Sequence, residues 1–247
     1  MLQPARMRAL LRSALDAILP RRCEVCRAGV VSRDGRALCS TCWSRVPRIE
    51  GPRCPVCGIP FRSDAALSQS PTHRCGDCHD SPPAFTRAVS AGLYEGVLAE
   101  AIRRYKYHRR VGLTPTFGEL LAPTLEALPV VDAVLPVPLH PRRLRTREFN
   151  QSLLLAAWVS RRLQRPLWPD ALRRIRWTDP QIGLDRNRRL TNVRHAFAVR
   201  HPEQVSGRRL LVVDDVLTTG ATVNECARVL CAAEAEAVFI VTLARMP

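Results

Sequence analysis

Residues 210–222 read LLVVDDVLTTGAT, and this stretch decides the fold of the chain. It opens with four apolar residues in a row, a pattern typical of a strand buried on both faces of a parallel sheet. Asp214 and Asp215 follow at the carboxyl end of that strand, which is the edge where open α/β sheets bind their ligands. The sequence therefore predicts an α/β fold with its ligand chemistry at these two carboxylates.

The segment after the acidic pair predicts an anion site. Small and hydroxyl-bearing residues lead into a helix there, and the unpaired N–H groups and positive dipole end of a helix favour a phosphate. A nucleoside triphosphatase is excluded, because a P-loop needs a Gly-Lys-Ser/Thr motif and the only lysine, Lys106, follows a tyrosine. The candidate phosphate-binding residues are Thr218, Thr219, Gly220, Ala221 and Thr222.

Length and composition set the outline of the protein. The 247 residues suffice for one α/β domain and a smaller module, and no apolar run approaches the length of a membrane span. Residues 1–20 are predicted to form a short amphipathic helix, and we expect a cytoplasmic protein with reduced thiols. The net charge of +16 is spread over the whole chain and favours a polyanionic partner.

Eight of the ten cysteines fall before residue 80 and form four Cys-x-x-Cys pairs. Two such pairs supply the four thiolates that a structural zinc ion binds as a tetrahedron. We therefore predict two closed zinc sites in a module over residues 21–83. Pairing neighbours along the chain is the simplest arrangement, but a crossed arrangement, first pair with third, has the same composition. The predicted ligands are Cys23, Cys26, Cys39, Cys42, Cys54, Cys57, Cys75 and Cys78.

The larger domain is expected over residues 84–247. Its apolar patterns predict further strands and helices around the strand at 210–213 and the helix after residue 222. The predicted strands are 84–94 and 130–137, and the predicted helices are 98–107, 117–128 and 153–163.

A second conspicuous segment, PVPLHPRRLRTREFNQS at residues 136–152, is interpreted as a loop. It lies between a predicted strand and the next helix, and it carries four arginines. Guanidinium groups at the carboxyl end of a strand suit a pyrophosphate, although a solvated charged loop has the same composition. The candidate residues are Arg142, Arg143, Arg145 and Arg147.

These motifs together resemble a known family. The stretch 210–222 is similar to the ribosyl-phosphate fingerprint of type I phosphoribosyltransferases, and the four cysteine pairs and the segment 136–152 narrow the resemblance to the ComF group. That group, which includes ComFC, joins an N-terminal double zinc ribbon to a phosphoribosyltransferase domain with a parallel sheet flanked by helices. Nearly the whole chain is covered. Other matching positions are Tyr94, Lys106, Tyr107, Phe149, Asn150, Gln151, Thr178, Gln181, Leu184, Arg189, Asn192 and Phe197.

The resemblance implies roles for the candidate residues. In type I phosphoribosyltransferases the acidic pair holds the ribose hydroxyls of phosphoribosyl pyrophosphate (PRPP), and the following loop holds its 5′-phosphate. Asp214 and Asp215 would take the first role and residues 218–222 the second, with Mg²⁺ accompanying PRPP. The expected reaction displaces pyrophosphate from C1 by a nitrogen nucleophile. Residues 176–197 would form a mobile hood that excludes water, or else an ordinary polar loop.

One position departs from the ComF pattern. Glu148 stands where the family usually has glycine before Phe-Asn-Gln. Glycine there would permit a positive φ or a close ligand approach. A carboxylate beside a pyrophosphate is repulsive unless magnesium or arginine neutralises it, so binding of PRPP is better supported than catalysis.

Two other interpretations stay open. Residues 103–110, RRYKYHRR, interleave basic and aromatic side chains as single-strand nucleic-acid surfaces do, but they also suit a helix with inward tyrosines. The resemblance further implies a link to DNA uptake, with single-stranded DNA, or a competence helicase or uptake component docked on the zinc ribbons, as partner. A non-catalytic nucleic-acid-binding or docking factor is therefore the alternative to a transferase.

Overall fold

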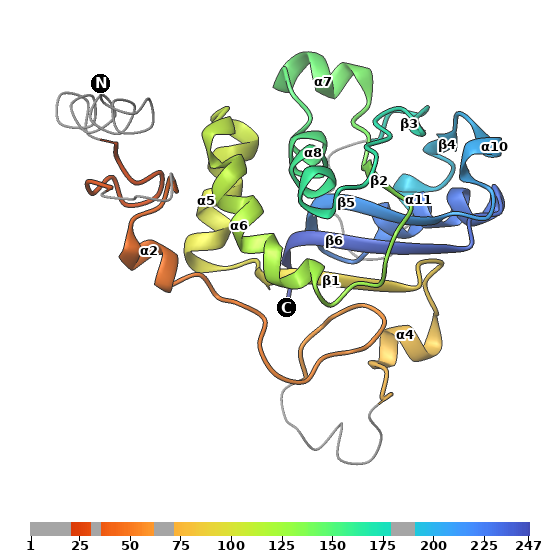
Figure 1. Ribbon diagram of the computed structural model, residues 1–247, viewed down its shortest axis with the longest axis horizontal. Helices are drawn as coiled ribbons and strands as arrows, with labels where there is room; N and C mark the ends of the chain where they lie inside the picture. The colour runs from red at the N-terminus through yellow and green to blue at the C-terminus, as the bar shows by residue number, and fades with distance from the viewer. Residues whose placement is uncertain (1–20, 31–35, 62–71, 179–190) are drawn as a thin grey trace, which may run out of the picture.

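The computed structural model describes residues 21–30, 36–61, 72–178 and 191–247. The helix expected at residues 1–20 lies outside that part of the chain. The centre is a parallel sheet in the order β1-β6-β5-β2, with helices on both faces (Figure 1). The prediction of a parallel sheet flanked by helices is confirmed. Its strands are β1 (Arg87–Leu93), β2 (Ala133–Pro136), β5 (Arg209–Leu217) and β6 (Ala237–Arg245).

Strand β5 is buried on both faces, as its unbroken apolar run predicts. Leu210 and Val212 belong to the apolar cluster beneath helix α11 (Ala221–Ala232), and Leu211 and Val213 belong to the opposite cluster. All four side chains are fully buried. The helices packed into that opposite cluster are α5 (Gly96–Tyr107), α6 (Thr114–Leu125) and α8 (Gln151–Leu163).

Local sequence fixes the position of α8. The Asn150 side-chain oxygen caps the helix by accepting hydrogen bonds from the N–H groups of Ser152 and Leu153, at 3.0 and 3.4 Å. Helix α6 packs closely on α8, because a Cβ added at Gly118 would lie 2.1 Å from the Trp158 ring. The first turn of α8 is thereby held at the carboxyl edge of the sheet.

The segment 136–152 contains a helix, α7 (Pro141–Arg147), where the sequence predicted a loop. The helix starts with proline at its first position, and the His140 Nδ1 caps it by accepting from the Arg142 N–H at 3.2 Å. No side chain of α7 is buried. Apolar periodicity, the main sequence signal for a helix, is therefore missing from this segment.

An antiparallel pair of short strands, β3 (Leu172–Arg174) and β4 (Phe197–Val199), forms a separate ribbon beside α11, followed by α10 (Pro202–Val205). The ribbon is fastened to α11, since the buried Glu225 carboxylate accepts a hydrogen bond from the His195 N–H at 2.7 Å. It flanks the segment expected to be a hood. Residues 179–190 of that hood lie outside the described residues.

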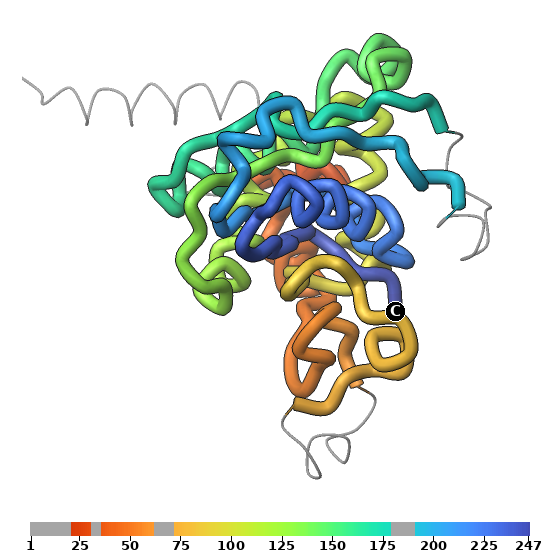
Figure 2. The backbone as a smooth tube through the Cα atoms, turned by 90° about the vertical axis from the view of Figure 1, so that its right-hand side faces the viewer, coloured from red at the N-terminus to blue at the C-terminus, as the bar shows by residue number. Residues whose placement is uncertain are grey.

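The cysteine-rich segments contain two short helices, α2 (Ser40–Ser44) and α4 (Gly76–Asp80), and the chain at residues 47–56 lies beside β1 (Figure 2). Two backbone hydrogen bonds of 2.7 Å join them to the strand, from the Leu93 N–H to the Pro47 carbonyl and from the Ala88 N–H to the Val56 carbonyl. They thus cover the free edge of β1, which would otherwise present unpaired backbone groups.

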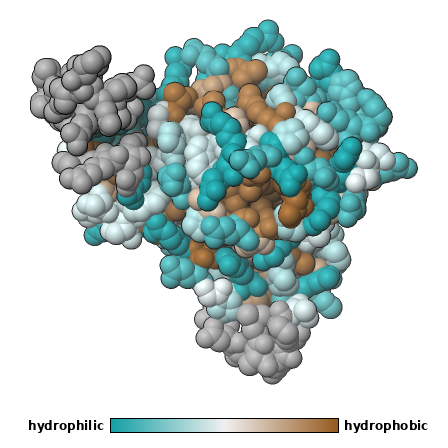
Figure 3. All heavy atoms as spheres, viewed as in Figure 1, coloured by the Kyte–Doolittle hydropathy of each residue, from teal (hydrophilic) through white to brown (hydrophobic). Residues whose placement is uncertain are grey.

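The surface of the protein agrees with its charged composition. In the space-filling view, hydrophilic side chains cover much of the face above the sheet, and apolar side chains show between them (Figure 3). Within the described residues, no helix combines the length and the apolar character that crossing a membrane requires.

Candidate active site

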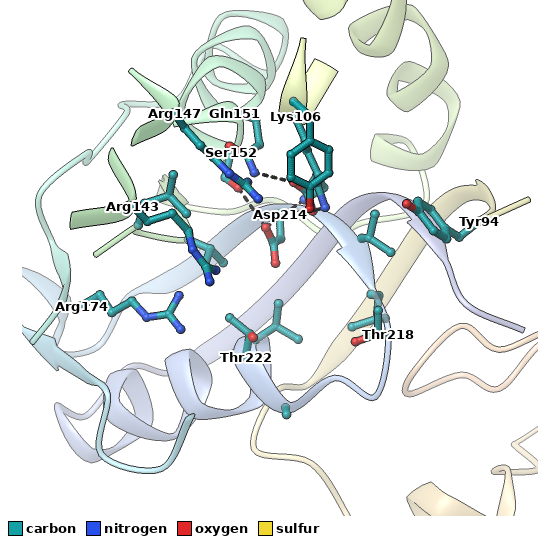
Figure 4. A pocket seen from close by; sticks show the side chains of 18 of the residues that line it. Tyr94, Lys106, Arg143, Arg147, Gln151, Ser152, Arg174, Asp214, Thr218 and Thr222 are labelled. Carbon is teal, nitrogen blue, oxygen red and sulfur yellow. Dashed lines mark hydrogen bonds and ion pairs between the residues drawn. The ribbon is translucent and has the colours of Figure 1, made fainter. Parts of the chain in front are cut away.

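The carboxyl end of β5 opens into a cavity of about 840 Å³ (Figure 4). Helix α11 begins there directly after Gly220, whose φ of 80° is a left-handed conformation that glycine adopts freely. The first turn of α11, with its backbone N–H groups at the positive end of the helix dipole, therefore lies at the cavity wall. Thr219 is not among the lining residues; its Oγ1 accepts from the Ala221 N–H at 3.4 Å. Of the predicted residues here, Asp214, Asp215, Thr218, Gly220, Ala221 and Thr222 line the cavity.

Asp215 is held on both of its carboxylate oxygens. Its Oδ1 lies 2.7 Å from the Nζ of Lys106, at the end of α5, and its Oδ2 accepts a hydrogen bond of 2.9 Å from the Gln151 Nε2. The aspartate is only 5% exposed. Burial alone would lower the pKa of Lys106, but the attraction of Asp215 outweighs it and raises that pKa. Lys106 is therefore a cation in this site.

Asp214 has different surroundings. Its Oδ1 accepts hydrogen bonds of 2.9 Å from the Ser152 Oγ and from the Asp215 backbone N–H. Its carboxylate points toward the space between Arg143 and Thr222 (Figure 4). Burial, and then the neighbouring Asp215 charge, raise the pKa of Asp214 to about 7, against the opposing effect of Lys106. The ionised form of Asp214 is therefore disfavoured in the ligand-free protein.

Helix α7 sorts the four predicted arginines into two pairs. Arg143 and Arg147 line the cavity, whereas Arg142 and Arg145 are exposed and are not among its lining residues. Positions four apart share one face of a helix, which explains why residues 143 and 147 reach the cavity together. Burial lowers the pKa of Arg143, as expected of a guanidinium drawn partly out of water.

Two more lining residues are Arg174, in the β3–β4 ribbon, and Trp177, in the segment expected to form a hood. Arg174 ends β3, and burial, followed by repulsion from Arg143, lowers its pKa to about 10. Trp177 lies three residues further on, with the Arg143 guanidinium 5.7 Å from its ring centroid. Figure 4 shows the Arg143 and Arg174 guanidinium groups directed toward the same part of the cavity. Positive charge therefore gathers opposite the acidic pair.

Other lining residues were also missed as site residues, namely Tyr94, Lys106, Gln151 and Ser152. A signal existed for Tyr94, Lys106 and Gln151, because all three are positions that carried the resemblance to the ComF group. For Arg174 there was none, since β3 is too short to show a pattern, whereas Trp177 lies in the segment 176–197 that was expected to form a hood.

Glu148 does adopt the backbone conformation for which glycine is suited. Its φ is 65°, at the residue that ends α7. A glutamate there is strained relative to glycine. Its carboxylate lies 2.7 Å from the Arg109 Nη2, with both side chains well exposed, so an arginine accompanies the extra negative charge.

The two tyrosines of residues 103–110 point in opposite directions. Tyr105 is fully buried and packs edge-on against Phe117, whereas Tyr107 is 54% exposed at the cavity. Residues two apart on a helix do not share a face, which accounts for the difference. Tyr105 therefore fits the interpretation of a helix with inward tyrosines. Tyr107 is exposed, as the interpretation of a nucleic-acid surface requires.

The eight predicted zinc ligands form two groups of four, pairing neighbours along the chain rather than crossing. In each group the sulfur atoms all lie within 4.8 Å of one another, and the Cys26–Cys39 and Cys57–Cys75 sulfur distances are 3.6 Å. Zn–S bonds of about 2.3 Å in a tetrahedron place sulfurs about 3.8 Å apart. A disulfide would need about 2.05 Å. The groups are Cys23, Cys26, Cys39 and Cys42, and Cys54, Cys57, Cys75 and Cys78.

Burial disfavours the ionised form of thiols in these groups. Burial, with the nearby Cys54 and Cys75 adding to it, raises the pKa of Cys57 to about 11. A divalent ion reverses that effect, because it binds thiolates and displaces their protons. The clusters are thus consistent with two zinc sites.

Comparison with known proteins agrees with this architecture. A double zinc ribbon domain matches residues 14–79, and a phosphoribosyl transferase domain matches residues 151–247. A solved structure of glutamine PRPP amidotransferase from B. subtilis, complexed with ADP and GMP, is 23% identical with a TM-score of 0.36. That match covers 51% of this chain and 25% of the amidotransferase chain.

Three relatives align over most of their length. DNA utilization protein YhgH of Escherichia coli (strain K12) is 35% identical over 92% of this chain and 98% of its own. Competence protein F of Haemophilus influenzae is 31% identical, covering 91% and 96%. Competence protein ComFC of Bacillus subtilis is 26% identical, covering 83% and 82%.

The fold, the cysteine clusters and the two matched domains together define the class of protein, in which a double zinc ribbon is joined to a phosphoribosyltransferase-type domain. Within that class, the chain belongs to the ComF family, with YhgH and competence protein F as its relatives.

Proposed function

We propose that the protein binds Mg²⁺-PRPP in this cavity and transfers the phosphoribosyl group to a nitrogen acceptor. The observation that supports this most is the convergence of three kinds of group on one cavity. Carboxylates at 214 and 215 suit ribose hydroxyls, and the start of α11 suits a 5′-phosphate. Guanidinium groups at 143 and 147 suit a pyrophosphate. These are the three parts of PRPP.

The residues present also fit Mg²⁺. Carboxylate oxygens are its preferred protein ligands, and Mg²⁺ usually binds through one or two of them together with substrate phosphates. Asp214 and Asp215 offer such oxygens at the cavity. When bound, the ion would neutralise charge on the pyrophosphate and help orient it.

In the proposed reaction the bond between C1 of the ribose and the pyrophosphate oxygen breaks, and its electron pair leaves with pyrophosphate. Arg143 and Arg147 stabilise that departing charge. The lone pair of the acceptor nitrogen forms the new bond to C1, and the nitrogen then loses a proton to water. The Asp214 carboxylate stabilises positive charge on the ring, so positioning and electrostatics carry the reaction without a covalent nucleophile.

We extend this proposal to the setting in which the protein works. Its relatives are named for DNA utilization and competence, which supports a role in the use of DNA taken up by the cell. The cytoplasm is the proposed compartment. We propose residues 21–83 as the zinc module and residues 84–247 as the transferase domain.

Pyrophosphate release tests the transferase proposal. Zinc-loaded protein is incubated with Mg²⁺-PRPP and a panel of nucleobases and other nitrogen acceptors, beside an Asp214→Asn variant. We expect release that depends on one class of acceptor and falls at least about a hundred-fold in the variant, as for loss of an electrostatic group at a reacting centre. Absence of release with every acceptor, despite PRPP binding, would leave a binding protein rather than an enzyme.

A second candidate, single-stranded DNA binding, is favoured by the aromatic rim of the cavity. Tyr107 is 54% exposed, and the Arg147 guanidinium lies 5.0 Å from its ring centroid. Arginine beside an exposed aromatic ring suits stacking of a base next to a phosphate. This proposal predicts DNA affinity that falls steeply with salt and drops in Tyr107→Ala but not in Tyr107→Phe. Affinity equal to that of wild type in both variants would remove Tyr107 from the DNA site.

A further inference from the structure

Lys106 makes a contact that the proposed reaction does not require. Its ammonium group is 2.7 Å from Asp215, its side chain is 16% exposed, and it is the only lysine of the chain. Gln151 occupies the other oxygen of Asp215. Each oxygen of the Asp215 carboxylate therefore has one partner from the protein, and the ammonium group balances its negative charge.

Contacts near the end of helix α5 restrain the position of Lys106. Close to Lys106 in the sequence, Arg104 donates a hydrogen bond to the Glu24 carbonyl, and the Arg110 Nε lies 3.5 Å from the Glu24 carboxylate. Glu24 follows Cys23, a ligand of the first zinc site. The first zinc ribbon therefore holds the end of α5, and the ammonium group is held in place at the acidic pair.

The charge at this point matters for a divalent cation. Two adjacent ionised carboxylates carry two negative charges, which favour Mg²⁺ by themselves. A fixed ammonium group at hydrogen-bond distance removes half of that charge and repels an incoming cation. Arg143 and Arg174 add positive charge across the cavity. A polyphosphate carries negative charge of its own, which would offset these positive charges and allow the divalent cation to bind with it.

We propose that Lys106 is the resident counter-ion of the acidic pair: by occupying Asp215 it keeps Mg²⁺ from binding to the two carboxylates alone, so that the cation enters with PRPP. The part of this inference that concerns PRPP rests on the proposed function. Lys106 acts through Asp215 and is a positioning residue. Asp214, whose carboxylate faces the cavity, and Asp215 beside it then bind the ribose and the cation as proposed above.

Mn²⁺ alone is the probe, because carboxylate sites accept it in place of Mg²⁺ and its electron paramagnetic resonance signal reports the free ion. Wild-type protein is compared with Lys106→Met, which removes the charge, and with Lys106→Arg, which keeps it. Without PRPP, we expect Mn²⁺ to bind at least about ten-fold more tightly to Lys106→Met, and Lys106→Arg to resemble wild type. The double variant Lys106→Met/Asp215→Asn should lose the gain.

A purely structural ion pair would give another result. In that case Lys106→Met would lower the melting temperature and leave Mn²⁺ affinity unchanged or weaker, which overturns the proposal. Lys106→Gln, which also removes the charge, replaces the methionine variant if that one does not fold. Since the Mn²⁺ titration contains no PRPP, its outcome is independent of PRPP binding by wild-type protein, and the two proposals fail separately.

Discussion

Ser152 donates a hydrogen bond from its Oγ to the Asp214 Oδ1 over 2.9 Å, and so joins the first turn of α8 to the end of β5. The contact favours the ionised form of Asp214, whose pKa nevertheless rises to about 7 because burial and Asp215 disfavour the charge. The charged form of Asp214, the acid that faces the proposed ligand, is thus energetically disfavoured in the ligand-free protein. Such a shift is common at sites that bind a cation or a hydrogen-bonding substrate.

Asp214→Asn is expected to stabilise the ligand-free protein at high pH. The folded pKa of about 7 lies above the ordinary aspartate value of 3.8, so the folded state binds the proton more tightly. The contribution of this group to stability is therefore present below about pH 4 and lost as the pH rises through 7. Melting temperatures should show the variant above wild type at pH 8, with a smaller difference at pH 5. A difference independent of pH would contradict the raised pKa.

Glu148→Gly should stabilise the protein relative to Glu148→Ala. The left-handed backbone at this residue costs an alanine or glutamate about 1 kcal/mol that glycine avoids. Both variants remove the exposed pair with Arg109, which contributes little, so their difference isolates the backbone. Urea unfolding measures it. Equal free energies of unfolding for the two variants would show that the conformation carries no strain.

Arg147→Gln should weaken binding of Mg²⁺-PRPP by about ten-fold or more, the size expected for one charge-assisted hydrogen bond. Arg145→Gln is the matched control, because it removes the same charge from the same helix outside the cavity, and should change affinity less than about two-fold. Isothermal calorimetry at fixed ionic strength makes the comparison. If both variants lose affinity equally, the arginines act only through the general positive field of α7.

Cys39→Ser should remove one zinc ion per chain, and Cys75→Ser the other, since the two cysteines belong to separate clusters. We also expect the melting temperature to fall in both variants, because structural zinc sites contribute directly to folding. Elemental analysis of purified protein gives the zinc content. Loss of both ions in either variant would mean that the clusters are not independent.

The parts of the site that are contiguous in sequence were predictable. Strand β5, the loop and helix α11 occupy residues 209–232 without interruption. The strand continues through the acidic pair to Leu217 rather than ending before it, but the apolar run still places the carboxylates near the carboxyl edge of the sheet. The cysteine pairs were equally clear, although spacing left the pairing open. Asp214 and the phosphate loop are therefore recognisable from the amino-acid sequence alone.

The contacts between distant segments were not predictable. Lys106 meets Asp215 because α5 is packed between the first zinc ribbon and the sheet, and no local pattern expresses that packing. The arginines of α7 were treated as equivalent, since without the helix nothing separates Arg143 from Arg145. Arg174 reaches the cavity from a strand too short to leave a periodic signal.

The most direct test of the central claim is a calorimetric titration of Mg²⁺-PRPP into zinc-loaded wild-type protein, beside Asp214→Asn and the exposed control Asp170→Asn. We predict saturable binding with one site per chain in wild type and in the control, and loss of that binding in Asp214→Asn. Absence of binding to well-folded wild-type protein, or equal binding by all three proteins, would contradict a ribosyl-phosphate site at the end of β5.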